Sequence, residues 1–115
     1  MLVIKKSQFA QMGEVSFVER LRSVLLESFP EQVRAIPATE LNAEILRQAR
    51  RAETYGMTSE TSAATFVVTA WMLGLDFDTR FEDVQHTLTS TWLTQDQKSN
   101  WLQQFSVKLL EALAH

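Results

Sequence analysis

The residues best suited to chemistry form one acidic stretch in the second half of the chain. Between positions 76 and 86 the sequence gathers carboxylates and one imidazole: Asp76, Asp78, Glu82, Asp83 and His86. Such groups bind divalent metals, and paired carboxylates can work as acid and base. The spacing fits poorly, because a calcium loop needs Asp-x-Asp-x-Asp-Gly and Arg80 takes the third ligand position. We therefore expect Asp78 to cap a short helix whose first turn holds Glu82 and Asp83.

Other catalytic arrangements are equally hard to find. The histidines, His86 and His115, share no helical spacing, and neither begins a His-Glu-x-x-His run. No serine lies in a Gly-x-Ser-x-Gly turn, and the chain has no cysteine to act as a nucleophile or zinc ligand. We predict no catalytic, metal-binding or cofactor-binding residue, and so no enzyme. A small metal-dependent or hydrolytic enzyme built on Asp76, Asp78 and His86 is kept as an alternative.

A short basic stripe offers a different chemistry. Arg47, Arg50 and Arg51 could together hold a phosphate or an acidic partner. Cations late in a helix also complement its dipole, and Glu44 precedes Arg47 by three residues, the spacing of an intrahelical ion pair. We favour the intrahelical explanation because such pairs are common.

Charge and length narrow the class of protein. The chain has 115 residues and a formal net charge of −3. Residues 1–56 carry eight Lys/Arg and seven Asp/Glu, a net +1, whereas residues 57–115 carry three and seven, a net −4. Nucleic-acid-binding proteins normally show a basic excess, so we expect no nucleic-acid partner.

The length of the chain is typical of a domain with one hydrophobic core, and we predict a single helical domain over residues 1–115.

The N-terminal residues do not read as a targeting signal. Two lysines follow the apolar run Leu2-Val3-Ile4, the reverse of the charge order in a signal peptide, and no small-residue cleavage site follows. The longest apolar stretch, residues 63–75, is interrupted by two threonines and a glycine and is too short to span a bilayer. We expect a cytoplasmic protein that does not enter a membrane.

Helical periodicity runs through most of the chain. Apolar residues recur at three- and four-residue spacing over residues 14–29 and again over residues 39–55. We expect Pro30 to end the first helix and Thr39 to cap the second. Gly56 fits the left-handed position that follows many helix C-termini.

A third helix, over residues 59–73, differs in kind. Thr58 or Ser59 caps it, Gly74 ends it, and from residue 63 onward it is apolar nearly all round. A helix without a polar face is enclosed by others. We predict an all-α fold, a compact bundle of about five helices around this buried central helix.

Two further helices complete the predicted bundle. Asp78 begins a short one, and Thr94 with Gln97 forms a capping box before the last. The last helix is expected to bury six apolar residues: Trp101, Leu102, Phe105, Leu109, Leu110 and Leu113.

The tryptophans point to both core and surface. Trp71 lies in the enclosed helix and is expected in the core, whereas Trp92 lies in a broken segment. Tryptophan is strongly enriched at interface hot spots. The candidate partner-binding residues are Leu2, Val3, Ile4, Trp92, Trp101, Phe105 and Leu109. Whether the chain also forms a homodimer is left open.

Three short motifs follow one another along the chain. They are Tyr55-Gly56-Met57-Thr58-Ser59-Glu60, Ala64-Thr65-Phe66-Val67 and Leu73-Gly74-Leu75-Asp76-Phe77-Asp78. Together they resemble short all-helical proteins encoded beside PAAR-containing effectors and their adaptor chaperones in bacterial type VI secretion clusters. The resemblance covers roughly residues 14–95. It implies a co-chaperone or co-adaptor that binds the adaptor, which in turn loads a toxic effector onto the secretion spike, and it implies no catalytic residue.

We therefore expect a non-enzymatic protein-binding accessory. Its partner would be the adaptor chaperone, the effector or both, and the contact would be an apolar and aromatic patch rimmed by charge. An immunity protein that binds and inhibits a toxin is the alternative within the same class, because the acidic second half of the chain would suit a basic toxin.

Overall fold

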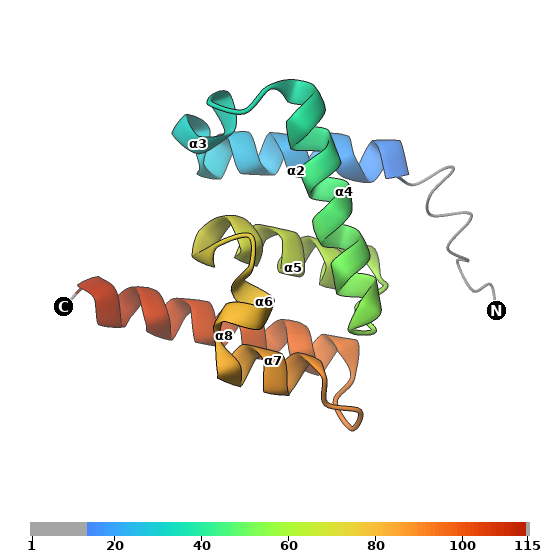
Figure 1. The fold of residues 1–115 in the computed structure, drawn as a ribbon, viewed down its shortest axis with the longest axis vertical. Coiled ribbons are helices and arrows are strands. Elements are labelled where there is room, and N and C mark those ends of the chain that lie inside the picture. Colours follow the sequence, from blue (N-terminus) through green and yellow to red (C-terminus); the bar gives the residue numbers. More distant parts are fainter. Residues whose placement is uncertain (1–13, 115) are drawn as a thin grey trace. The chain divides into compact units, whose positions relative to one another are not determined.

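Every regular element in the described part of the chain is a helix. The computed structural model describes residues 14–114, and this part contains seven helices and no strand (Figure 1). In chain order the helices are α2 (Glu14–Ser28), α3 (Pro30–Arg34), α4 (Ala38–Thr54), α5 (Glu60–Leu73), α6 (Phe77–Arg80), α7 (Glu82–Leu88) and α8 (Gln95–Ala114). The predicted all-α class is confirmed. Three candidate partner-binding residues, Leu2, Val3 and Ile4, lie outside the described residues.

The chain divides into two units within α4. Of the described residues, those up to Arg47 belong to the first unit, with α2, α3 and the first half of α4, and those from Gln48 onward belong to the second. Helix α4 continues without a break across this point. The sequence-based prediction of one domain over residues 1–115 stays a prediction.

The first unit follows the expected periodicity of α2 closely. Phe17, Val18, Leu21 and Leu25 are buried on one side of the helix. Val24 lies at the edge of that side and is exposed. Pro30 does end α2, but it also begins α3, a short helix that the periodicity missed, because proline is well suited to the first helical turn.

Helix α4 ends at Thr54, one residue before the predicted end, and begins before its predicted cap. Its first residue is Ala38, so Thr39 lies inside the helix and is not its cap. At the other end Gly56 has φ 80°, Met57 N donates to Ala52 O at 3.0 Å, and Gly56 N donates to Glu53 O at 2.9 Å. These two bonds form a Schellman motif, which needs the left-handed residue that glycine supplies.

Helix α5 confirms the expectation of an enclosed helix. No residue from 62 to 73 is exposed. The hydroxyl groups of its two threonines find hydrogen-bond acceptors within the helix. Thr65 Oγ1 donates to Thr61 O at 3.0 Å, and Thr69 Oγ1 donates to Thr65 O at 2.7 Å. Of the two expected caps, Ser59 is the one used, accepting from Ser62 N at 3.1 Å.

The segment after α5 holds two short helices where one was expected. Phe81 has extended backbone (φ −104°, ψ 118°) and separates α6 from α7. The prediction that Asp78 caps a helix is wrong, because Asp76 takes the N-cap position of α6 and Asp78 lies inside it. The break at Phe81, together with α3, gives seven described helices in place of about five.

Helix α8 begins at the predicted capping box. Thr94 N donates to Gln97 Oε1 at 2.8 Å, and Gln97 N donates to Thr94 Oγ1 at 3.1 Å. In Figure 1, α8 runs alongside α5 and α7, and both pairs are in contact. Of its six expected core residues only Leu102 is fully buried, whereas Leu110 and Leu113 are exposed.

Candidate functional site

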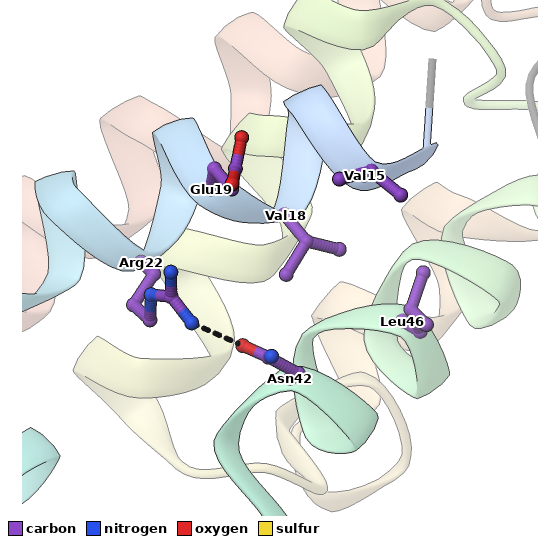
Figure 2. A pocket seen from close by; sticks show the side chains of 6 residues that line it. All are labelled: Val15, Val18, Glu19, Arg22, Asn42 and Leu46. Carbon is purple, nitrogen blue, oxygen red and sulfur yellow. Dashed lines mark hydrogen bonds between the residues drawn. The ribbon is translucent and has the colours of Figure 1, made fainter. Parts of the chain in front are cut away.

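A cleft lies within the first unit, between α2 and the first half of α4. It measures about 230 Å³ and is lined by Val15, Val18, Glu19, Arg22, Asn42 and Leu46 (Figure 2). Val18 points from α2 toward α4, and Arg22 Nη1 donates to Asn42 Oδ1 at 3.2 Å. Ligand pockets usually exceed about 300 Å³, so the cleft suits one apolar side chain better than a small molecule. Val18 and Leu46 belong to the two apolar periodic segments, residues 14–29 and 39–55, and that periodicity gave no signal of a cleft.

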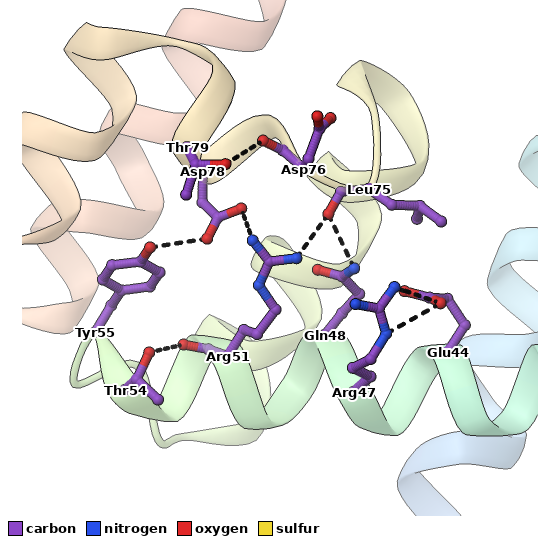
Figure 3. Close-up of polar contacts among 10 residues, drawn as sticks. All are labelled: Glu44, Arg47, Gln48, Arg51, Thr54, Tyr55, Leu75, Asp76, Asp78 and Thr79. Carbon is purple, nitrogen blue, oxygen red and sulfur yellow. Dashed lines mark hydrogen bonds and ion pairs between the residues drawn. The ribbon is translucent and has the colours of Figure 1, made fainter.

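The strongest polar network lies in the second unit, around Asp78. This carboxylate is only 1% exposed. Arg51 Nη2 forms an ion pair with Asp78 Oδ1, and the Tyr55 hydroxyl donates to Asp78 Oδ2 at 2.8 Å (Figure 3). A buried carboxylate needs such partners, because desolvation of an unpaired charge is costly.

Arg51 also joins α4 to the turn before α6. Its Nη1 atom donates to Leu75 O at 3.0 Å, and Gln48 Nε2 donates to the same carbonyl at 3.0 Å. Figure 3 shows Arg51 between this carbonyl and the Asp78 carboxylate. One guanidinium therefore satisfies a backbone acceptor and neutralises a buried charge.

The surroundings of Tyr55 stabilise the protonated form of its hydroxyl. Burial first, and then the hydrogen bond to Asp78 and the charge of that carboxylate, raise the pKa of Tyr55 to about 12 from an ordinary 10.0. The hydroxyl holds its proton at neutral pH, so it acts as a hydrogen-bond donor and is poorly suited to be a nucleophile or a base.

The first turns of α8 hold the connection between α4 and α5. Gln95 Oε1 accepts from Thr58 N at 2.8 Å and from Ser59 N at 2.9 Å. Lys98 Nζ donates to Tyr55 O at 2.7 Å, and burial lowers the pKa of this lysine. Polar side chains of α8 thus cap both α4 and α5.

The acidic stretch does not assemble into a metal site in the described residues. No three carboxylate or imidazole side chains between residues 14 and 114 are grouped as metal ligands would be. Asp78 is engaged by Arg51 and Tyr55, whereas Asp76 and His86 are exposed. Glu82 and Asp83 do lie in the first turn of α7, as expected.

The basic stripe is also engaged within the chain. Arg47 Nη2 forms the expected ion pair with Glu44 at 2.6 Å. Arg51 belongs to the Asp78 network. Arg80, in the acidic stretch, lies over the ring of Phe81 at 5.8 Å.

Several residues of the motifs that carry the resemblance make contacts between helices of the second unit. Tyr55 and Asp78 share the buried hydrogen bond, and Phe66 packs between Tyr55 and Phe77 with ring centroids 5.9 and 4.8 Å apart. Gly74 has φ 122°, a conformation suited to glycine. These residues connect α4, α5 and α6 of the second unit.

Two of the candidate partner-binding residues stack on α8. The Trp101 and Phe105 rings lie 5.1 Å apart and nearly parallel, and Phe105 meets Phe81 edge-on at 5.5 Å. Leu109 lies one turn further along α8, and Trp101, Phe105 and Leu109 are all half-buried. We name these three the aromatic row.

Trp92 is the most exposed aromatic side chain in the described residues. It lies between α7 and α8, is 72% exposed, and its ring is 6.5 Å from that of His86. The other exposed large apolar residues that follow it are Val107, Leu110 and Leu113, all on α8. Exposed apolar surface of the second unit is thus concentrated on α8 and the loop before it.

No helix between residues 14 and 114 is both long and apolar enough to cross a membrane.

Comparisons of the chain with models of protein families, with curated proteins and with solved structures find no match.

Proposed function

We propose that this chain is a non-enzymatic accessory that binds an adaptor chaperone in type VI secretion effector loading. One observation carries the protein-binding part: the exposed apolar side chains that gather on α8 and the loop before it, led by Trp92. Contiguous exposed apolar surface usually marks a protein contact. The secretion context is supported by the motif resemblance alone.

The docking surface consists of Trp92, the aromatic row and the exposed apolar residues of α8, which are Val107, Leu110 and Leu113. Trp101 and Phe105 are held rigid by stacking, so little side-chain entropy is lost when a partner covers them. Trp92 offers a large exposed ring that no core packing requires. Interface hot spots are typically such aromatic anchors.

Calorimetric titration tests this surface. The titrant is the adaptor chaperone encoded beside the chain's gene, identified by mass spectrometry after it co-purifies with a tagged copy. Trp92→Ala should weaken binding by about 2 kcal/mol, or roughly 30-fold, as loss of a hot-spot side chain does. Trp101→Ala and Phe105→Ala should do the same once circular dichroism shows that each is folded.

Leu26→Ala is the matched control, because Leu26 is an exposed apolar residue of α2, in the first unit, and is not one of the residues of the docking surface. It should bind like the parent. The docking surface is elsewhere if all three aromatic variants also bind like the parent, and the adaptor proposal fails if the adaptor shows no binding at all.

An immunity protein that inhibits a basic toxin is the second candidate, and the charge distribution favours it. Of the seven carboxylates in residues 57–115, only Asp78 is buried. The remaining six face solvent and give the second unit an acidic surface. This candidate would be favoured over the first if the chain inhibited a toxin encoded directly beside its own gene and bound no adaptor chaperone.

A further inference from the structure

The cleft between α2 and the first half of α4 is most exposed where α2 begins. Val15, in the first turn of α2, lines the cleft and is 64% exposed, more than any other large apolar residue described in the first unit. Toward the other end, Arg22 bonds Asn42 across the two helices (Figure 2). Arg22 follows Val15 by seven residues, or about 10 Å along α2. The cleft is therefore bridged at its far end and accessible at the end nearest residue 14.

The lining of the cleft combines aliphatic surface with polar groups. Val15, Val18 and Leu46 supply aliphatic surface from both helices, and Glu19 supplies a carboxylate. Asn42 accepts from Arg22 through Oδ1, so its amide group can still donate to a backbone carbonyl. Such a lining suits an extended segment with aliphatic side chains and a neighbouring cation.

The size of the cleft favours a segment of the same chain over a separate protein. It measures about 230 Å³, whereas a specific interface between two proteins buries at least about 1,200 Å². A tethered segment has an effective concentration in the millimolar range, on the order of 1 mM, and no second molecule has to be immobilised. A contact too small to hold a free partner can therefore hold a segment of this chain.

We infer that the run Leu2-Val3-Ile4 of the same chain occupies this cleft. The run belongs to residues 1–13, which precede α2 and lie outside the described residues. Ile4 precedes the first residue of α2 by ten residues, which span up to about 33 Å when extended. The cleft extends about 10 Å along α2, so the run can reach all of it.

The chemistry of the run matches the lining. In an extended run Leu2 and Ile4 face the same side, so both can enter the cleft while Val3 faces outward. Lys5 and Lys6 follow the run directly. An antiparallel course along α2 brings these lysines nearer to the start of α2 than the run itself, away from Arg22 and toward the side where Glu19 supplies a negative charge.

This inference goes beyond the proposed function. It assigns Leu2, Val3 and Ile4, which the sequence made candidate partner-binding residues, to a contact within their own chain. The docking surface on α8 is unchanged by it.

Disulfide cross-linking of the 115-residue chain tests this contact, because the chain contains no cysteine. The double variant Val3→Cys/Leu46→Cys keeps Leu2 and Ile4, the two side chains that enter the cleft. At about 1 µM protein, contact within one chain is favoured over collision between chains by roughly a thousandfold. Under mild oxidation the variant should form an internal disulfide, detected by mass spectrometry after proteolysis.

Val3→Cys/Ala43→Cys is the matched control. Ala43 is an exposed residue of the same helix, three residues before Leu46, and does not line the cleft. Because a disulfide needs Cα atoms about 4.4–6.8 Å apart, the Leu46 pair should form at least about ten times faster than this control. Equal rates would overturn the inference.

Charged substitutions identify the side chains that enter the cleft. Adding Leu2→Asp and Ile4→Asp to the Leu46 pair should slow the disulfide to the rate of the Ala43 control, because a carboxylate loses hydration against aliphatic surface. Phe9→Asp should leave the rate unchanged, since Phe9 lies in the same segment but outside the run. The opposite pattern would overturn the inference. A Leu46 disulfide found only between two chains would also overturn it, by placing the run in the cleft of another copy.

Hydrogen–deuterium exchange checks the contact without thiol chemistry. Residues 15–22 and 42–46 should exchange faster in Leu2→Asp/Ile4→Asp than in Phe9→Asp, because the first variant leaves the cleft open to water. Equal exchange in the two variants would contradict the inference. None of these results affects the adaptor proposal, whose titrations measure residues of α8 and the loop before it.

Discussion

Removal of the Arg51 guanidinium should destabilise the second unit more than any ordinary surface substitution. In Arg51→Met the Asp78 carboxylate stays buried and keeps only the Tyr55 hydroxyl as a partner. Leu75 O also loses one of its two donors. The substitution keeps most of the side-chain length, so the change is chiefly electrostatic.

The magnitude follows from burial. Breaking a fully buried ion pair by removing one partner costs about 3–5 kcal/mol, whereas an exposed pair contributes about 0–1 kcal/mol. The Asp78 side chain is 2% exposed and that of Arg51 is 27% exposed, so water can partly replace the guanidinium. We expect a loss near the lower end, about 3 kcal/mol. This is a large share of the 5–15 kcal/mol typical of small proteins.

Urea unfolding followed by circular dichroism provides the measurement. Arg47→Met is the control on the same helix, since Arg47 forms an exposed pair with Glu44, and it should cost less than about 0.5 kcal/mol. Adding Asp78→Asn to Arg51→Met should recover part of the loss, because no uncompensated charge is then buried. Equal stabilities of Arg51→Met and Arg47→Met would refute the reasoning.

Four further outcomes follow from the same structure. Tyr55 is the only tyrosine, so tyrosinate absorbance should titrate near pH 12 in the folded chain and near 10 in urea. The free energy of unfolding should consequently fall between pH 10 and 12, by at most about 1.4 kcal/mol per pH unit. The lowered pKa of Lys98 has the opposite effect, because it makes the free energy of unfolding rise with pH. The Tyr55→Phe variant keeps the Lys98 effect and lacks the tyrosine effect, so comparing it with the parent separates the two. Trp71→Ala should cost about 3–5 kcal/mol in urea unfolding, because the ring is buried; a loss below 1 kcal/mol would contradict its place in the core. Thr94→Ala should cost about 1 kcal/mol by removing half of the capping box, and an unchanged urea midpoint would contradict the importance of that bond. The single-domain prediction requires a radius of gyration of about 13 Å by X-ray scattering, and a clearly larger value for the monomer would contradict it.

Features that depend on local sequence were predictable. Gly56 ends a helix because few other residues adopt its positive φ, and Thr94 with Gln97 forms its cap within four residues. The enclosed character of α5 also follows from local composition, since the helix has no polar face. Each of these needs no knowledge of what lies elsewhere in the chain.

Features that depend on distant partners were not predictable. Asp78 has a residue type that suits both a helix cap and a buried ion pair, and only the approach of Arg51 from α4 decides between them. Leu110 and Leu113 continue an apolar pattern that periodicity assigns to the core. Their exposure follows from α5 being shorter than α8, which the pattern of α8 alone does not contain.

The candidate site was predictable only in part. Residue type singled out Trp92 and the aromatic row, because tryptophan and phenylalanine are typical anchors. Periodicity did not show that the rings of Trp101 and Phe105 stack or that Phe105 meets Phe81 edge-on. The contact between Phe105 and Phe81 joins α8 to the residue between α6 and α7, so the pattern of α8 alone does not contain it.

Hydrogen–deuterium exchange of the chain, alone and saturated with the adaptor chaperone, tests the central claim most directly. If α8 and the loop before it form the docking surface, exchange should slow in residues 90–94 and 101–114, while α2 and α3 remain unchanged. Protection confined to α2 and α3, with α8 exchanging as in the free chain, would contradict the account.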